Sequence, residues 1–257
     1  MQDMNLKSLI SSRELKHSLW IIVILTLIFG FNDGRSTFEW GPWINNLFSV
    51  FVLVIITILA HMIGAKLSAG RLGQEAELEM VSIKGLRFNV LGTRIEERFN
   101  WNIFGFKLKS IPLGAVVGLL FMLMSYGTFY LTAISTIIVR KMPRFGKGYT
   151  LDENKEALIY FWAIVANLAL IVAFNSLNIE KGVVIGSYFI LWNLLPIHGL
   201  LGSKIFFNNK TLYVFFLIFT LLFLLFFTKM DLILLVILAA VIAFLIMVFW
   251  IFEREYK

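Results

Sequence analysis

Apolar residues are concentrated in long blocks, and these blocks define the predicted elements of the chain. Residues 211–228 and 232–252 are apolar on every face that a helix would present. A helix needs about 20 such residues to cross the hydrocarbon core of a bilayer. The blocks cover residues 18–31, 47–65, 111–138, 157–176, 182–200, 211–228 and 232–252. This pattern predicts an all-α polytopic membrane protein, with most of its chain in the bilayer.

Basic residues between the blocks predict how the spans are oriented. Lys7, Arg13 and Lys16 precede the first block, and residues 66–109 contain eight Lys and Arg, whereas residues 32–46 contain one. Because loops rich in Lys and Arg stay in the cytoplasm, the N-terminal tail and residues 66–109 are predicted to be cytoplasmic. The loop 32–46 is then predicted to lie outside.

The third block, residues 111–138, does not fit a single crossing. It is 28 residues long, is interrupted at 125–128, and precedes the basic loop 140–147, which a single crossing would place outside. A re-entrant hairpin that is shielded from lipid by other protein resolves these conflicts. We therefore expect the other six blocks to be transmembrane helices, with one re-entrant hairpin and both termini in the cytoplasm. A bundle of seven spans is the alternative.

A polarity period of two predicts a short β-hairpin in the cytoplasmic segment. The residues from Glu75 to Met80 alternate strictly between acidic and apolar, and Lys84 and Gly85 separate them from a second apolar run. Alternation around a turn that contains glycine is typical of two paired strands. We expect surface strands over residues 75–91, at the cytoplasmic face of the membrane and beside the ends of the spans.

Composition and charge narrow the classes of function. Apolar residues make up 59% of the 257 residues and charged residues only 15%, whereas soluble domains contain about 25% charged residues. The net charge of +7 is explained by the cytoplasmic loops, so we expect the lipid bilayer and no nucleic acid as a partner. The absence of cysteine excludes disulfides and thiolate metal sites. Residues 1–257 are expected to form a single membrane-embedded domain.

His61 and His198 lie within or at the end of apolar blocks, where an ionisable side chain is costly and indicates function. His198 belongs to the run from Asn193 to Gly202, which reads Asn-Leu-Leu-Pro-Ile-His-Gly-Leu-Leu-Gly. This run resembles the Asn-x-x-Pro-x-x-x-Leu-Asp-Gly signature of the site-2 protease family, the intramembrane zinc metalloproteases, in its prokaryotic form. Asn193, Pro196 and Gly202 match the signature.

Two further segments resemble motifs of this family. Its His-Glu-x-x-His motif is expected near the cytoplasmic end of the second span, and the stretch from His61 to Ala65 stands there. A small-residue segment that ends in Asn167 is similar to a third family feature. The resemblance covers most of the chain and implies a site-2 protease-like core in the cell membrane. The residues that it implies as the lining of a site are Ala65, Asn167, Asn193, Pro196, Leu201 and Gly202.

The resemblance also implies a zinc site, but the chain lacks most of the chemical groups of that site. His61 retains the first ligand position, whereas Met62 stands at the general-base position and Ala65 and Leu201 stand at ligand positions. A catalytic zinc needs about three protein ligands. We therefore expect no catalytic residue and no cofactor, with His198 as a loop residue that caps backbone groups. A zinc site rebuilt from His61, His198 and a surface carboxylate is the alternative.

Three functions are consistent with these observations. The first, implied by the resemblance, is a proteolytically inactive pseudoprotease that binds transmembrane segments of client proteins, with the strands at 75–91 offering an edge for an added client strand. The second is an active intramembrane zinc metalloprotease with a rearranged metal site, acting in regulated intramembrane proteolysis. The third is a small transporter or channel, indicated by the hairpin and the Pro-interrupted block 182–200.

Overall fold

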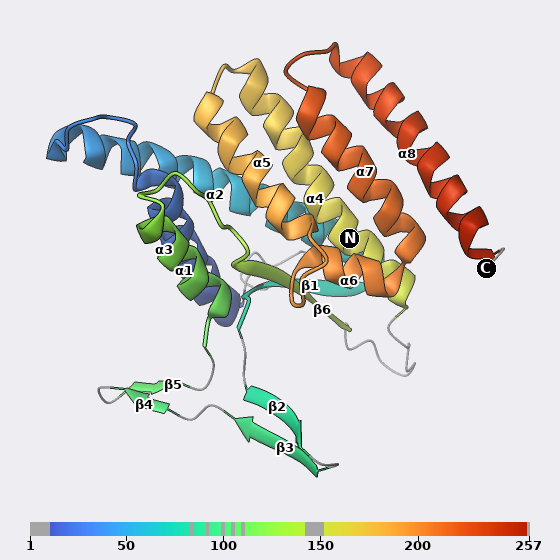
Figure 1. The fold of residues 1–257 in the computed structure, drawn as a ribbon, viewed down its shortest axis with the longest axis horizontal. Coiled ribbons are helices and arrows are strands. Elements are labelled where there is room, and N and C mark those ends of the chain that lie inside the picture. Colours follow the sequence, from blue (N-terminus) through green and yellow to red (C-terminus); the bar gives the residue numbers. More distant parts are fainter. Residues whose placement is uncertain are drawn as a thin grey trace, which may run out of the picture.

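Helices dominate the computed structural model, which describes residues 11–82, 85–90, 93–98, 101–103, 106–108, 111–141 and 152–255 (Figure 1). The helices are α1 (Ser12–Gly30), α2 (Trp40–Arg71), α3 (Leu113–Met124), α4 (Glu153–Ser176), α5 (Glu180–Leu194), α6 (Leu201–Asn208), α7 (Lys210–Phe226) and α8 (Leu232–Glu255). The strands are β1 (Gln74–Met80), β2 (Gly85–Val90), β3 (Thr93–Arg98), β4 (Trp101–Ile103), β5 (Phe106–Leu108) and β6 (Ser135–Lys141). Among the described residues, the three helices α2, α4 and α8 are long and apolar enough to cross a membrane, and α3 and α7 are shorter apolar helices.

The helices differ from the predicted blocks mainly at their ends. α2 begins at Trp40, before the predicted block 47–65, and continues to Arg71. α5 ends at Leu194 rather than at residue 200, because Pro196 cannot continue a helix and disfavours helical geometry in the residue before it. The block 182–200 is therefore a 15-residue helix followed by a loop. Membrane crossing by α1, α5 and α7 stays a prediction.

The predicted β-hairpin over residues 75–91 is wrong in its pairing. β1 pairs antiparallel with β6, with Leu78 opposite Ile137, while β2 pairs with β3. Residues 83, 84 and 91 of the predicted hairpin lie outside the described residues. Alternation along a strand sets the face that each side chain takes, but it does not select the partner strand. Here the partner comes from the segment that follows α3.

The second edge of β1 is covered by the first turns of α1. The Glu14 carboxylate accepts a hydrogen bond from the Leu78 N–H (3.1 Å), and His17 Nδ1 accepts one from the Met80 N–H (3.3 Å). An uncovered edge strand invites pairing with another chain. Because β1 has partners on both sides, the outer edge of this two-stranded sheet lies on β6.

Residues 113–134 form a hairpin made of a helix and an irregular return segment, which runs back towards β6 (Figure 1). A Cβ atom on Gly114 would lie 2.0 Å from the Ala133 carbonyl oxygen, and one on Gly118 would lie 2.9 Å from that of Leu131. These glycines let the return segment lie directly on α3. The predicted hairpin at 111–138 thus has a counterpart in the fold, and its depth in a membrane stays a prediction.

The irregular return segment is held by hydrogen bonds to α5. Backbone groups that leave regular structure inside a bundle need partners. The Trp192 indole donates to the Tyr130 carbonyl (2.7 Å), and the Thr132 hydroxyl donates to the Tyr188 carbonyl (3.1 Å). These contacts fix the segment between α3 and α5.

A polar cluster marks one end of the bundle, opposite the end that carries β1 and β6. We call the end that carries β1 and β6 the sheet side, and the end where α1 stops and α2 and α5 begin the far side. On the far side, Asn46 donates to the Gly30 carbonyl (2.9 Å) and accepts a hydrogen bond from the Lys181 ammonium (2.6 Å). α2 runs from the far side to the sheet side, and α4 runs in the opposite direction.

Candidate functional site

Close packing of α2 against α4 positions the histidine of the motif-like segment. Gly64 follows His61 by about one helical turn. A Cβ atom on Gly64 would lie 2.6 Å from the Trp162 carbonyl oxygen and 2.7 Å from Ala166 Cβ. Glycine therefore allows the two helices to approach this closely, as small residues do at many contacts between membrane helices. The approach places His61 next to Asn167 of α4.

His61 and Asn167 form a buried polar pair. Their exposed fractions are 0% and 1%, and His61 Nδ1 lies 2.8 Å from Asn167 Nδ2. In the tautomer that carries its proton on Nε2, His61 accepts a hydrogen bond from the amide at Nδ1. The same amide nitrogen donates to the Ala163 carbonyl (3.3 Å). The pair thus links α2 to α4 through neutral groups.

α5 forms a third wall of this region. The rings of His61 and Phe189 meet edge to face, with 5.1 Å between their centroids. Asn193 lies about one turn beyond Phe189, has an exposed fraction of 0%, and donates from Nδ2 to the Phe189 carbonyl (2.9 Å). The structure therefore brings the segments of His61, Asn167 and Asn193 together from three helices.

The turn from α5 into α6 is shaped by the remaining residues of the Asn-x-x-Pro run. Pro196 is exposed and follows the last turn of α5. A Cβ atom on Gly202 would lie 2.0 Å from the Leu194 carbonyl oxygen, so α6 packs directly against the end of α5. The Tyr213 hydroxyl of α7 donates to the same carbonyl (3.2 Å). Three helices are thus joined at the end of the run.

Three buried polar atoms in this region have no hydrogen-bond partner among the described residues: His61 Nε2, Asn167 Oδ1 and Asn193 Oδ1. Nearly all buried polar atoms of native proteins are paired. The core therefore contains unpaired polar atoms at this position, although apolar side chains would be enough to pack it. The chemistry that they offer is hydrogen bonding by neutral groups.

The residues at the other motif positions are buried and apolar. The exposed fractions of Met62, Ala65 and Leu201 are 6%, 2% and 0%. Met62 packs towards α1, where its sulfur accepts a hydrogen bond from the Ser18 hydroxyl (3.7 Å). The zinc ion that the resemblance implies needs about three protein ligands. His61 is the single nitrogen ligand in this set, so these residues do not fit a catalytic zinc.

His198 does not share the environment of His61. Its side chain is exposed on the loop between α5 and α6, whereas His61 is fully buried in α2. Two glutamates of β1 are engaged in ion pairs: Glu77 with Arg140 (3.1 Å) and Glu79 with Arg13. Within the described part of the chain, no three His, Asp or Glu side chains are close enough together to hold a metal ion.

A buried ionic cluster at the sheet side was not among the predicted site residues. The Glu14 side chain has an exposed fraction of 0%, and its carboxylate accepts hydrogen bonds from Lys66 Nζ (2.7 Å) and the Leu78 N–H. The signal that identifies this region is the Ser-x-x-Glu spacing of a capping box, which marks a helix start. Ser11 caps α1 by accepting a hydrogen bond from the Glu14 N–H (3.1 Å).

Lys204 of α6 is a second charged group with a defined place at the sheet side. Its ammonium donates to the Ile137 carbonyl (2.6 Å) and lies 5.4 Å from the centroid of the Tyr160 ring. Burial lowers the pKa of Lys204 to about 8, and the nearby carboxylates of Glu156 and Glu79 oppose this shift. Lys204 therefore fastens α6 to the outer edge of β6.

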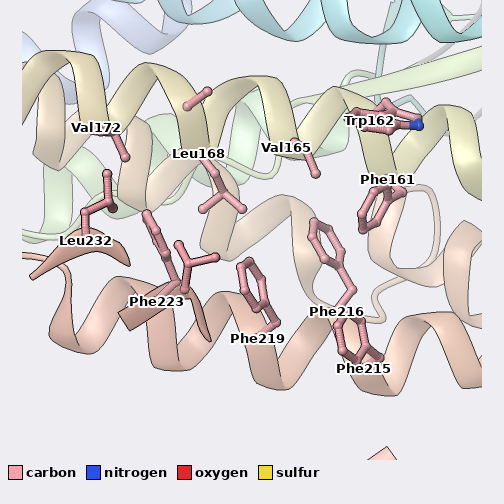
Figure 2. Close-up of a pocket in the computed structure, with 12 residues that line it drawn as sticks. Phe161, Trp162, Val165, Leu168, Val172, Phe215, Phe216, Phe219, Phe223 and Leu232 are labelled. Carbon is pink, nitrogen blue, oxygen red and sulfur yellow. The ribbon is translucent and has the colours of Figure 1, made fainter. Parts of the chain in front are cut away.

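An apolar groove of about 550 Å³ lies between α4, α7 and α8. Figure 2 shows Phe219 and Phe223 of α7 facing Val165 and Leu168 of α4 across this groove. Apolar and aromatic walls of this kind are typical of surfaces that contact lipid or another apolar helix. The groove is separate from the region of His61, which is lined by α2, α4 and α5.

The segments that resemble family motifs lie on α2, α4 and α5 and meet at His61, Asn167 and Asn193. Comparisons with protein-family models, curated proteins and solved structures found no match to this chain. The resemblance to the site-2 protease family therefore rests on these residues and on their convergence.

Proposed function

We propose that this chain is an integral membrane protein with the core plan of the site-2 protease family, and that it binds transmembrane segments of client proteins without cleaving them. The observation that carries this proposal is the convergence of His61, Asn167 and Asn193 from three helices in one buried region. These residues were selected from the sequence alone. Unrelated membrane helices would bring the three motif-like segments together only by coincidence.

The replaced motif positions argue against hydrolysis. A zinc protease needs a metal-bound water and a positioned general base. Met62, Ala65 and Leu201 are buried apolar side chains, and they provide neither a ligand nor a base. The neutral groups of His61 and Asn167 keep the helices in the family-like arrangement, so binding is retained without the chemistry.

In this proposal the sheet side faces the cytoplasm. Arg71 and Lys204 lie on this side, which agrees with the tendency of basic residues to stay in the cytoplasm. α1, α5 and α7 complete six crossings together with the three long helices. α3 and its return segment form the re-entrant hairpin, whose backbone is shielded by α5 through Trp192.

A client strand is expected to bind at the outer edge of β6 and not at residues 75–91. Glu14 and His17 already occupy outward N–H groups of β1. Because the Leu78 N–H points to Glu14, its antiparallel partner Ile137 presents its own backbone groups on the outer edge of β6. The Ile137 carbonyl is bound there by the Lys204 ammonium. An added client strand would displace this side chain and take over the carbonyl.

Site-specific photocrosslinking in native membranes tests this proposal. A photoreactive residue at Arg140, which is exposed on β6, is expected to capture membrane proteins through segments in or next to their transmembrane helices. The matched control is the same residue at Glu180, which is exposed on the far side. Lys204→Met frees the Ile137 carbonyl and is expected to raise capture at position 140. Equal capture at both positions, with no effect of Lys204→Met, would contradict the proposal.

Metal analysis of the purified protein separates this function from proteolysis. An active protease with a rearranged site would carry about one zinc ion per chain, and His61→Ala would abolish both zinc and cleavage. The proposed pseudoprotease is expected to carry no stoichiometric zinc, in the wild type and in His61→Ala alike. Zinc that the wild type binds and the variant loses would favour the active protease instead.

A further inference from the structure

A groove between α2 and α4 opens on the outside of the bundle. It has a volume of about 400 Å³ and is lined mainly by apolar side chains, including Ile63 and Leu67 of α2 and Leu158, Trp162, Val165 and Ala169 of α4. Trp162, Val165 and Ala169 also line the groove of Figure 2, so α4 forms a ridge between the two grooves. The groove between α2 and α4 differs from the other one in carrying a charged residue.

The length of this groove matches one leaflet of a bilayer. α4 rises by about 16 Å from Leu158 to Ala169, at roughly 1.5 Å per residue. One leaflet contributes about 15 Å, half of a hydrocarbon core of roughly 30 Å. The groove begins at the sheet side, next to the end of α2, so it extends across the depth of the leaflet on that side.

Arg71 stands at the sheet-side end of the groove. It is the last residue of α2 and its side chain is exposed. Within the described part of the chain, no ion pair or hydrogen bond engages its guanidinium. A guanidinium is suited to phosphate oxygens because it can bind two of them side by side. The groove therefore has apolar walls along its length and a positively charged side chain at its sheet-side end.

We propose that this groove binds one acyl chain of an anionic phospholipid from the leaflet on the sheet side, with the lipid phosphate at Arg71. The proposal rests on the membrane placement in the proposed function. Basic pockets between membrane helices on the cytoplasmic side are suited to anionic headgroups. The negative headgroup complements the guanidinium, and the chain follows the apolar walls of Leu158 and Ala169.

The size of the groove favours an acyl chain over a client helix. A ten-residue helical segment about 10 Å wide and about 15 Å long would fill roughly 1,200 Å³. The groove offers about 400 Å³, which excludes a helix with its side chains. A single file of methylenes is narrow enough, and it has the length of one leaflet.

Native mass spectrometry of the full chain tests the headgroup contact. The protein is reconstituted in phosphatidylcholine nanodiscs that contain phosphatidylglycerol as a minor component, and the lipids that stay bound after release are counted. The wild type is expected to retain about one phosphatidylglycerol. Arg71→Gln is expected to lower the preference for phosphatidylglycerol about fivefold, the effect of one surface charge. Lys16→Gln removes an exposed charge on the same side, away from the groove, and should leave the preference unchanged.

A second variant tests the acyl chain itself. Ile63→Trp fills the inner end of this groove from an exposed position that does not line the groove of Figure 2, so it is expected to reduce bound lipid of either headgroup. Unchanged lipid number and preference in both Arg71→Gln and Ile63→Trp would overturn the proposal and leave only exchangeable annular lipid. Client capture from position 140 is read separately in the same variants. Its absence with normal lipid binding would contradict the proposed function and not the lipid site.

Discussion

The ionic cluster around Glu14 and the neutral pair of His61 and Asn167 both lie against α2, and they differ in how completely their polar atoms are satisfied. Both carboxylate oxygens of Glu14 have partners, the Lys66 ammonium and the Leu78 N–H. His61 Nε2 and Asn167 Oδ1 have none among the described residues. The site that resembles a family motif is the less complete of the two.

This difference follows from what each group costs when it is buried. An unpaired buried charge is far more costly than an unpaired neutral group. A fully buried carboxylate such as Glu14 therefore persists only with partners fixed around it. An imidazole or an amide tolerates an unmet hydrogen bond at a cost of about 1–3 kcal/mol. The strongest structural constraint thus lies where α1 meets β1, away from the motif-like residues.

The largest expected effect comes from breaking the ionic cluster. Glu14→Ala removes a partner of the partly buried Lys66 ammonium, leaves the buried Leu78 N–H without its acceptor and opens a cavity, so the free energy of unfolding should fall by about 3–4 kcal/mol. Chemical denaturation in detergent micelles measures this change. Glu153→Ala, at an exposed glutamate in the first turn of α4, should change it by less than about 0.5 kcal/mol. If both variants lose a similar free energy of unfolding, the Glu14 cluster stabilises the fold no more than an ordinary surface charge does.

The next largest effect concerns the helix contact that supports the neutral pair. Gly64→Ala places a Cβ atom 2.6 Å from the Trp162 backbone oxygen. Because backbone cannot move aside as a side chain tip can, the free energy of unfolding should fall by about 2–3 kcal/mol. Gly70→Ala on the same helix has nothing within 4 Å of the new atom and should leave stability unchanged or raise it. An equal response of both variants would show that α2 and α4 are not held at Gly64.

A double-mutant cycle sharpens the account of the neutral pair itself. Asn167→Leu leaves His61 Nδ1 buried without this partner, so the free energy of unfolding should fall by about 1–2 kcal/mol. Adding His61→Leu removes the second polar group and should recover most of the loss, because apolar groups of similar size replace both partners. Losses that simply add in the double variant would show that the two side chains do not interact.

The smallest expected effect is a pH dependence from Lys204. Its pKa of about 8 in the folded protein lies below the value of about 10.4 for an unfolded lysine. Between these values the unfolded chain binds more protons, so the free energy of unfolding should rise with pH from about 8 to about 10.4. Lys204→Met should remove this rise, and Lys229→Met, at an exposed lysine, should keep it. If the free energy of unfolding of Lys204→Met still rises over this pH range, a group other than Lys204 causes the rise.

Much of the helical framework was predictable, because apolar blocks of bilayer length need no tertiary information. The alternation at 75–80 also predicted β1 correctly, since side-chain faces in a strand follow from local sequence. The partner strand was predicted wrongly, because β6 is separated from β1 by the whole of α3. Likewise, His61, Asn167 and Asn193 could be selected from motif spacing, but their hydrogen bonds depend on how the helices pack.

The sequence by itself determined that the chain is apolar over long segments, and that the apolar residues Met62, Ala65 and Leu201 stand where the motifs that it resembles carry reactive groups. These properties follow from residue type, period and spacing. Only the tertiary structure decided that Glu14 is buried against Lys66, that α1 covers one edge of β1, and that β6 pairs with the other. Such pairings join residues far apart in the chain, so long-range packing selects them and local pattern does not.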